Sequence, residues 1–221
     1  MNTYHIIFWV LLIIALLVST QFAKKREKKL AVNKAKFCSK FSFLEKGHVY
    51  SEMHKHGFSL IDRASGYYGD YETSSILSKV KDREEFCFFD FEYIPKHADK
   101  SNTNKFSTIR AVLIRFRDRE LYNFELRPEN VIEKIKQVFG SSDIDFEGHP
   151  EFSKKYVLTG TDPALIKARF PTVLIRRLES KSGFCIEARK TCLLIYNPEE
   201  SEFEDYENLY KEALFINDCL R

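Results

Sequence analysis

The first 23 residues of the chain contain no Lys, Arg, Asp or Glu, and residues 6–18 (IIFWVLLIIALLV) are an unbroken apolar run. With the uncharged residues that follow, the stretch has about 18 residues and as a helix would extend about 27 Å, close to the thickness of a bilayer core. A cleaved signal peptide would need basic residues before the run and a small-x-small site after it. MNTYH has no Lys or Arg, and the run ends in STQFA, so the sequence predicts an uncleaved transmembrane anchor at residues 1–23.

The positive charge near this segment all follows it. Residues 24–40 contain eight basic side chains against Glu27 alone, a net charge of +7, and since the whole chain carries +3, the remainder carries −4. Positive charge stays on the cytoplasmic side during membrane insertion, so we expect the N-terminus outside and the C-terminal domain in the cytoplasm. A reducing cytoplasm also suits the five cysteines as free thiols.

The basic stem at residues 24–40 has two interpretations. The side chains nearest the membrane could each contribute about 1 kcal/mol of binding to anionic headgroups. These membrane-surface candidates are Lys24, Lys25, Arg26, Lys28 and Lys29. The simpler interpretation is a topology signal and spacer, which we favour because a spanning helix already anchors the chain.

Residues 41–221 contain no internal repeat and no Pro- or Gly-rich linker, so we expect one domain. Alternating or continuous apolar patterns predict strands at 58–62, 74–80, 85–94, 108–116, 121–126, 155–159, 184–188 and 191–196. Short charged turns predict three hairpins, which join 74–80 to 85–94, 108–116 to 121–126, and 184–188 to 191–196. Helical periodicity and capping residues predict helices from Pro128 to Gly140, from Pro163, after Pro171, and over 203–220. This order indicates an α+β fold with a mainly antiparallel sheet and about four helices after the transmembrane helix.

Aromatic side chains concentrate at residues 86–93 (FCFFDFEY). In a strand, alternate residues from Cys87 to Tyr93 share one face, while Asp90 and Glu92 lie on the other. Two carboxylates on the second face would repel phosphate, so we interpret the aromatic residues as core and not as a stacking platform for single-stranded nucleic acid. The acidic balance of the domain agrees, and we expect no nucleic-acid partner.

The familiar catalytic motifs are missing. The sequence has no G-x-x-x-x-G-K-[ST], G-x-G-x-x-G, H-E-x-x-H, G-x-S-x-G or C-x-x-C motif. Without a glycine-rich phosphate cradle, ATP or dinucleotide chemistry is not expected, and the sequence predicts no cofactor.

The densest cluster of metal-ligand side chains is DIDFEGHPE at residues 143–151. If this segment is extended, Asp143, Asp145, Glu147 and His149 share one face and could converge on Mg²⁺, Mn²⁺ or Ca²⁺, or its carboxylates could share acid and base roles. Alternate residues of a strand lie about 7 Å apart, so an ion would need help from another segment. A solvated strand face or a loop is the simpler interpretation.

Two smaller groups of possible ligands remain. Residues 48–56 (HVYSEMHKH) contain three histidines with only Glu52 as a nearby acid, so a zinc site there would need remote ligands, and we interpret the histidines as surface or turn residues. Cys185 and Cys192 flank the last predicted hairpin and could be cross-strand neighbours. In a reducing compartment we expect them to be small buried hydrophobic side chains.

Several short motifs occur in a distinctive order over residues 86–178. After the span and the basic stem come FDFEY (89–93), TIRAVLIRF (108–116), FELRPE (124–129), DIDFEGHPEF (143–152) and YVLTG (156–160). In this order the chain resembles a family of uncharacterised bacterial membrane-anchored proteins with a single N-terminal span and a cytoplasmic α+β domain. The resemblance implies a location in the bacterial inner membrane and supplies no catalytic residue.

These features favour a non-enzymatic interaction module, tethered by a single span, that engages a protein or lipid partner at the cytoplasmic surface of the membrane. One alternative is a metal-dependent hydrolase or phosphoesterase that uses Asp143, Asp145 and Glu147 as ligands with His149 nearby. Another is a sensor of a lipid or a nucleotide. The sequence does not name the partner.

Overall fold

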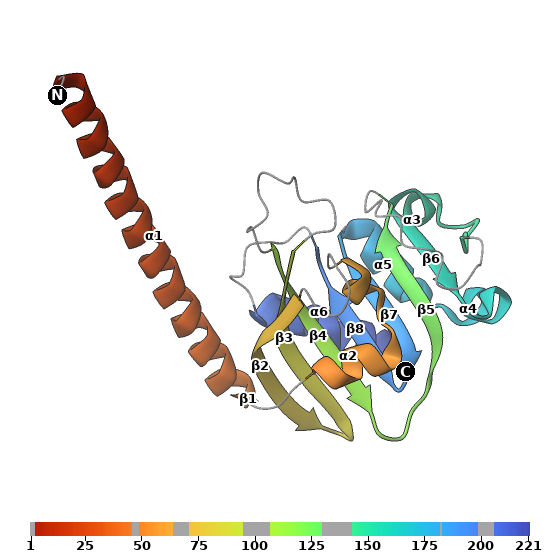
Figure 1. The fold of residues 1–221 in the computed structure, drawn as a ribbon. Helices are drawn as coiled ribbons and strands as arrows, with labels where there is room; N and C mark the ends of the chain where they lie inside the picture. The colour runs from red at the N-terminus through yellow and green to blue at the C-terminus, as the bar shows by residue number, and fades with distance from the viewer. Residues whose placement is uncertain are drawn as a thin grey trace.

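In the computed structural model of the chain, the described residues are 3–45, 49–63, 71–94, 107–129, 143–181, 183–198 and 206–221. The helices are α1 (Thr3–Phe41), α2 (Tyr50–His56), the 3-10 helix η1 (Ser59–Arg63), α3 (Pro150–Lys155), α4 (Pro163–Arg169), α5 (Thr172–Ser180) and α6 (Tyr206–Cys219). The strands are β1 (Leu44–Glu45), β2 (Tyr71–Lys81), β3 (Glu84–Tyr93), β4 (Ser107–Phe116), β5 (Leu121–Pro128), β6 (Tyr156–Gly160), β7 (Cys185–Lys190) and β8 (Cys192–Tyr196). Figure 1 shows this order.

The strands form one 8-stranded sheet in the order β1-β2-β3-β4-β8-β7-β5-β6. Every neighbouring pair is antiparallel, which confirms the predicted α+β class with a mainly antiparallel sheet. The described part of the domain has more helices than the four predicted, because the short helices α2 and α3 carry too few residues for a periodic pattern to show. Residues 130–142, which hold most of the helix predicted from Pro128, lie outside the described residues.

Two of the three predicted hairpins are confirmed. β2 pairs with β3, and β7 pairs with β8. The hairpin predicted between 108–116 and 121–126 is wrong, because β4 pairs with β8 while β5 pairs with β7 and β6. Every residue of β8 is buried, so this strand belongs in the middle of the sheet, and the β7–β8 hairpin lies between β4 and β5.

Two further predictions are corrected. The strand predicted at 58–62 is wrong: Ser59–Arg63 form η1, and the backbone N–H groups of Ser59 and Leu60 donate to the Glu187 carboxylate at 2.7 and 3.2 Å and do not pair with a strand. Pro128 ends β5, paired with Tyr156, and does not begin a helix. Proline is tolerated there because this end of β5 pairs with β6 alone: the ladder with β7 ends at Leu126, so Pro128 lies at a local sheet edge.

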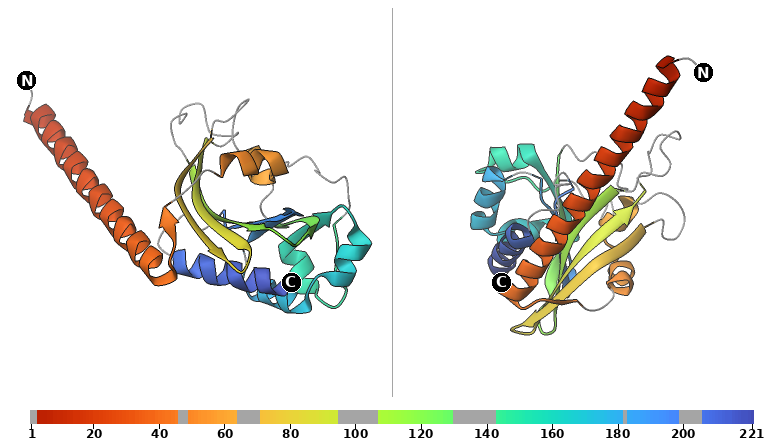
Figure 2. Two further views of the ribbon diagram at one scale, coloured as in Figure 1. Left: turned by 90° about the horizontal axis from the view of Figure 1, so that it is seen from below. Right: turned by 90° about the vertical axis from the view of Figure 1, so that its left-hand side faces the viewer.

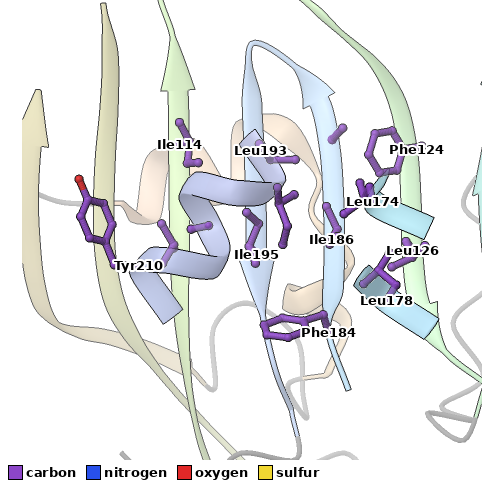
Figure 3. Packing of buried hydrophobic residues seen from close by; sticks show 14 of the residues in the cluster. Ile114, Phe124, Leu126, Leu174, Leu178, Phe184, Ile186, Leu193, Ile195 and Tyr210 are labelled. Carbon is purple, nitrogen blue, oxygen red and sulfur yellow. The ribbon is translucent and has the colours of Figure 1, made fainter. Parts of the chain in front are cut away.

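The sheet is covered on both faces. Figure 2 shows α2 on one side of the sheet and α6 on the other. The larger core lies between the sheet and α3 to α6, and Figure 3 shows Tyr210, Leu174 and Leu178 against strand residues such as Ile195 and Ile186. The second core lies beneath α2 and η1.

The prediction that residues 86–93 are core is confirmed. Alternate residues from Cys87 to Tyr93 face the second core, and Phe86 and Phe88 face the larger one. Asp90 is also buried, and the Arg110 guanidinium donates to both of its carboxylate oxygens at 2.8 and 3.0 Å. A bidentate pair of this kind satisfies the buried charge.

The later helices agree with their capping residues. Of the two residues that the sequence offers as the N-cap before Pro163, Thr161 and Asp162, it is the Asp162 side chain that caps α4, because it accepts a hydrogen bond from the Leu165 N–H at 3.0 Å. The apolar stripe of α5 is buried, and so are Tyr206, Tyr210 and Ala213 of α6. Residues 203–205 of that predicted helix lie outside the described residues.

Candidate functional site

Helix α1 joins the apolar segment to the domain without a break over 39 residues. Within the described residues it is the one helix long and apolar enough to cross a membrane. Its large apolar side chains from Ile7 to Phe22 are exposed. Figure 1 shows this part of the helix extending away from the sheet. The predicted anchor and the predicted basic stem are therefore parts of one helix.

The last turns of α1 belong to the core of the domain. Phe37 is 4% exposed, and its ring centroid lies 4.9 Å from that of Phe43, 5.2 Å from Phe88 and 5.3 Å from Tyr206. Tyr206 belongs to α6, at the other end of the chain. The packed domain thus extends into the segment that the charge pattern assigns to the stem.

Two ion pairs flank this aromatic contact. Lys40 Nζ lies 2.9 Å from Glu207 Oε1 at the start of α6, and Lys34 Nζ lies 2.6 Å from Glu45 Oε1 in β1. Hydrogen bonds from Lys211 and Lys40 lower the pKa of the Glu207 carboxyl. Exposed pairs of this kind add little stability, so apolar packing of Phe37 and Phe41 against α6 contributes more to holding α1 on the domain.

The five predicted membrane-surface residues all lie on α1, before the last turns of the helix that pack against the domain. Lys24, Lys25, Lys28 and Lys29 have exposed side chains. At about 100° per residue they fall within an arc of about 140°, so they share one side of the helix. Arg26 lies in the same helical turn.

The acidic run at residues 143–149 is a loop beside β6. Asp143 Oδ1 accepts a hydrogen bond from the Leu158 N–H at 2.8 Å, and His149 Nδ1 lies 3.1 Å from Glu179 Oε1. Asp145 and Glu147 are exposed. Partial burial raises the pKa of the Asp143 carboxyl. Over the described ranges, no three potential ligand atoms of this run come within 4.8 Å of one another, so the metal hypothesis gains no geometric support there.

A different group of ligand types meets between α2 and β8. Glu52 and His56 lie four residues apart on α2, and Cys192 is the first residue of β8. Their carboxylate, imidazole and thiol atoms all lie within 4.8 Å of one another. His54 faces elsewhere, with Nε2 2.8 Å from the Tyr71 hydroxyl. His48, the third histidine of this segment, lies outside the described residues.

Sequence reasoning identified Glu52 beside the histidines and noted that remote ligands would be needed. It did not place Cys192 near this segment. No local signal could have done so, because the proximity depends on α2 packing over β8 in the folded sheet.

Charged residues surround this group. Arg115 Nη2 lies 2.8 Å from Glu85 Oε2, and Arg115 Nη1 lies 3.9 Å from Glu52 Oε1. Burial, followed by the charge of Glu52, raises the pKa of the Cys192 thiol to about 11. Burial and Glu85 likewise raise the pKa of Cys87 to about 12. Neither thiol is a nucleophile at neutral pH, since the thiolate is the reactive form.

Cys185 and Cys192 are both buried, as predicted, and all five cysteines are free. They are not cross-strand partners, however. Cys185 lies opposite Tyr196 and Cys192 lies opposite Arg189. The β7–β8 register therefore separates the two thiols along the hairpin.

A second charged cluster is fully enclosed between β5, β7 and η1. Glu187 is 0% exposed and accepts from Ser59 N, Leu60 N and the Tyr196 hydroxyl, and its Oε2 lies 3.2 Å from Arg189 Nη2. Glu125 lies directly opposite Glu187 in the ladder. Sequence reasoning missed this group, because charges in FELR and EARK are typical of a solvated strand face. Buried charges must be paired, so the cluster fixes η1 over the sheet.

This cluster makes stability depend on pH. Burial, and next the charge of Glu187, raise the pKa of Glu125 to about 7. The folded state then holds a proton that the unfolded chain releases, so stability decreases as pH rises from about 4.5 to about 7. We expect Glu125→Gln, which stays neutral, to gain in thermal midpoint relative to the wild type as pH rises through this range. Parallel curves for the two proteins would contradict the assignment.

A pocket of about 260 Å³ opens between β5, the α4–α5 junction and the end of α6. Its lining is mixed: apolar side chains such as Phe124 and Phe170 contribute about as much as polar groups do, and three arginines border it. Arg169 Nη1 donates to the Tyr122 hydroxyl, Arg221 pairs with Glu84 at 3.1 Å, and Arg119 donates to Asn217. These guanidinium groups are thus engaged in contacts within the domain, which link β5 to α4 and the C-terminus to β3. The pocket is also smaller than usual ligand sites.

Comparison of the chain with models of known protein families, with curated proteins and with solved structures found no match. The resemblance to a family of bacterial membrane-anchored proteins therefore stays a prediction.

Proposed function

We propose that this chain is a single-pass membrane protein that holds an α+β interaction module at the cytoplasmic surface of the bacterial inner membrane. The observation that supports this most is the course of α1, which runs unbroken from an exposed apolar segment into the core of the domain. A row of large apolar side chains exposed on an isolated helix suits hydrocarbon and not water. Burial of Phe37 then fixes the angle at which the helix leaves the domain.

The stem also sets the distance between the membrane surface and the domain. From Lys24 to Phe37 the helix advances about 20 Å. Anionic headgroups lie next to the four lysines that share one side of α1, where each contributes about 1 kcal/mol. The membrane is thus one partner, and the domain is presented to a second, protein partner at a fixed height.

The orientation is tested with reporters fused after Arg221. A fluorescent protein that matures in the cytoplasm is expected to be fluorescent, and alkaline phosphatase, which is active only outside, is expected to be inactive. The matched variant adds two lysines before the span and replaces the five basic residues after it by Gln: Lys24, Lys25, Arg26, Lys28 and Lys29. This variant should show increased phosphatase activity and decreased fluorescence. Active phosphatase on the wild-type chain would overturn the proposed orientation.

The partner is tested by photo-crosslinking in intact membranes. Photoreactive side chains replace, one at a time, the large apolar residues that the described domain exposes: Leu44, Val80, Tyr122 and Val173. We expect a discrete adduct at one of these positions and none at the exposed, charged Glu151, which serves as the control. Absence of an adduct at all four positions, or hydrolytic turnover that is lost in Asp145→Ala, would contradict the interaction-module proposal.

A further inference from the structure

Helix α2 and strand β8 bring together three side chains of the kinds that bind zinc. Glu52 and His56 are four residues apart on α2 and therefore face the same side. Cys192 begins β8, beneath that side of the helix, and the three ligand atoms lie within 4.8 Å of one another. Figure 2 shows α2 lying over this face of the sheet.

We propose that Glu52, His56 and Cys192 bind a Zn²⁺ ion that joins α2 to β8. Thiolate, imidazole and carboxylate are the ligands that zinc takes in proteins. A mixed sulfur and nitrogen set disfavours Mg²⁺ and Ca²⁺, which prefer oxygen. Three protein ligands leave a fourth tetrahedral position for water or for a small ligand. This inference goes beyond the membrane-tethered module and does not depend on it.

The spacing of the ligand atoms fits a shared ion. Two ligands about 2.05 Å from one ion at the tetrahedral angle lie about 3.3 Å apart. His56 Nε2 lies 3.3 Å from Glu52 Oε2. A sulfur and a nitrogen bound to the same tetrahedral zinc ion lie about 3.6 Å apart. The Cys192 sulfur lies within 4.8 Å of the other two ligand atoms, which allows this distance. The Cys192 sulfur therefore has to approach the other ligand atoms by about 1 Å at most to complete the site.

The ligand side chains can be reached from solvent, and the positive charges of Arg115 and Lys55 also act on Cys192. The Cys192 thiol is buried, while the side chains of Glu52 and His56 are 22% and 14% exposed, so an ion can enter from the α2 side. On binding, the thiol proton leaves to solvent and the sulfur–zinc bond takes its place. The thiolate and the carboxylate together balance the charge of Zn²⁺.

Arg115 acts around the site and does not compete for the ligand atom. Its Nη2 is held by Glu85 at 2.8 Å, and its Nη1 lies 3.9 Å from Glu52 Oε1. The other oxygen, Oε2, is the one that faces His56. The arginine thus orients the carboxylate, as groups around metal ligands commonly do.

The test titrates Co²⁺ and then Zn²⁺ into the metal-stripped full chain in lipid nanodiscs. Cobalt reports its ligands through a thiolate charge-transfer band in the near ultraviolet and through intense visible bands when it is tetrahedral. We expect one Co²⁺ per chain with both signals, displaced by one Zn²⁺. The thermal midpoint should rise with Zn²⁺, because the ion binds the folded state.

Variants identify the ligands. Cys192→Ser should lose the charge-transfer band, and Glu52→Gln and His56→Gln should each weaken binding by at least about 10-fold. The matched controls are Cys185→Ser, a buried cysteine of the same core cluster, and His54→Gln, a histidine of the same helix. Both controls should bind as the wild type does. If Cys192→Ser does not fold, the two variants on α2 carry the test, since their side chains are partly exposed.

Three results would overturn the proposal. The first is a folded wild-type chain that gives no cobalt bands. The second is a charge-transfer band that survives in Cys192→Ser. The third is equal loss of binding in the control variants and in the ligand variants.

Discussion

Replacing Phe37 by Ala is expected to lower the free energy of unfolding of the domain by about 3–5 kcal/mol. The ring packs between the rings of Phe43 and Tyr206, at the junction of α1 with α6, and is almost fully buried. Removing it leaves a cavity that rigid neighbours on the sheet cannot fill. At about 2–4 °C for each kcal/mol, the thermal midpoint of the full chain in nanodiscs should fall by about 10 °C.

The matched control for this change is Val32→Ala. Val32 lies on the same helix but is 45% exposed, so its truncation should leave the midpoint unchanged. Equal midpoints for Phe37→Ala and the wild type would mean that the stem is a spacer outside the core. Unfolding is followed by circular dichroism, because the single tryptophan lies in the apolar segment and does not report on the domain.

Replacing Glu187 by Ala should destabilise the domain by about 3–5 kcal/mol. The substitution leaves the buried Arg189 guanidinium without its nearest carboxylate, at 3.2 Å. It also removes the acceptor for Ser59 N, Leu60 N and the Tyr196 hydroxyl. The loss of acceptors for these three buried donors is part of this cost and is not added to it. Chemical denaturation of the full chain in nanodiscs measures the loss.

Two further variants show whether the loss of stability comes from the buried hydrogen bonds and charge of Glu187. Glu187→Gln keeps a side-chain oxygen as acceptor and should lose less stability than Glu187→Ala. Glu151→Gln, which breaks the exposed pair with Lys154, should have no measurable effect. If Glu187→Ala were as well tolerated as Glu151→Gln, the buried cluster would not hold η1 on the sheet.

Local patterns were enough to place most elements of the fold. The hairpins of β2 with β3 and of β7 with β8 are each encoded by apolar runs joined by a short charged turn. The position of β5 depends on pairing with strands that come later in the chain, which adjacency in sequence cannot reveal. The 3-10 helix at Ser59 likewise depends on a carboxylate from β7, so propensity alone favoured a strand.

The candidate sites also differ in whether local sequence is enough to predict them. The apolar segment and the basic stretch can be recognised from composition alone, and the proposed membrane anchor rests on them. The α2 site needed Cys192 from a distant strand. The role of Phe37 was hidden as well, since one aromatic residue in a basic segment gives no sign of its partners on α6.

The proposal that α1 is connected rigidly to the domain is tested most directly by a distance measurement between spin labels. One label replaces Lys28 on α1 and the other replaces the exposed Val173 on α5, in the full chain in nanodiscs. Labels carried by noncanonical amino acids leave the five native cysteines unchanged. The account predicts one narrow distance distribution, which a Gly-Pro insertion after Asn33 should broaden. A wild-type distribution as broad as that of the insertion variant would contradict it.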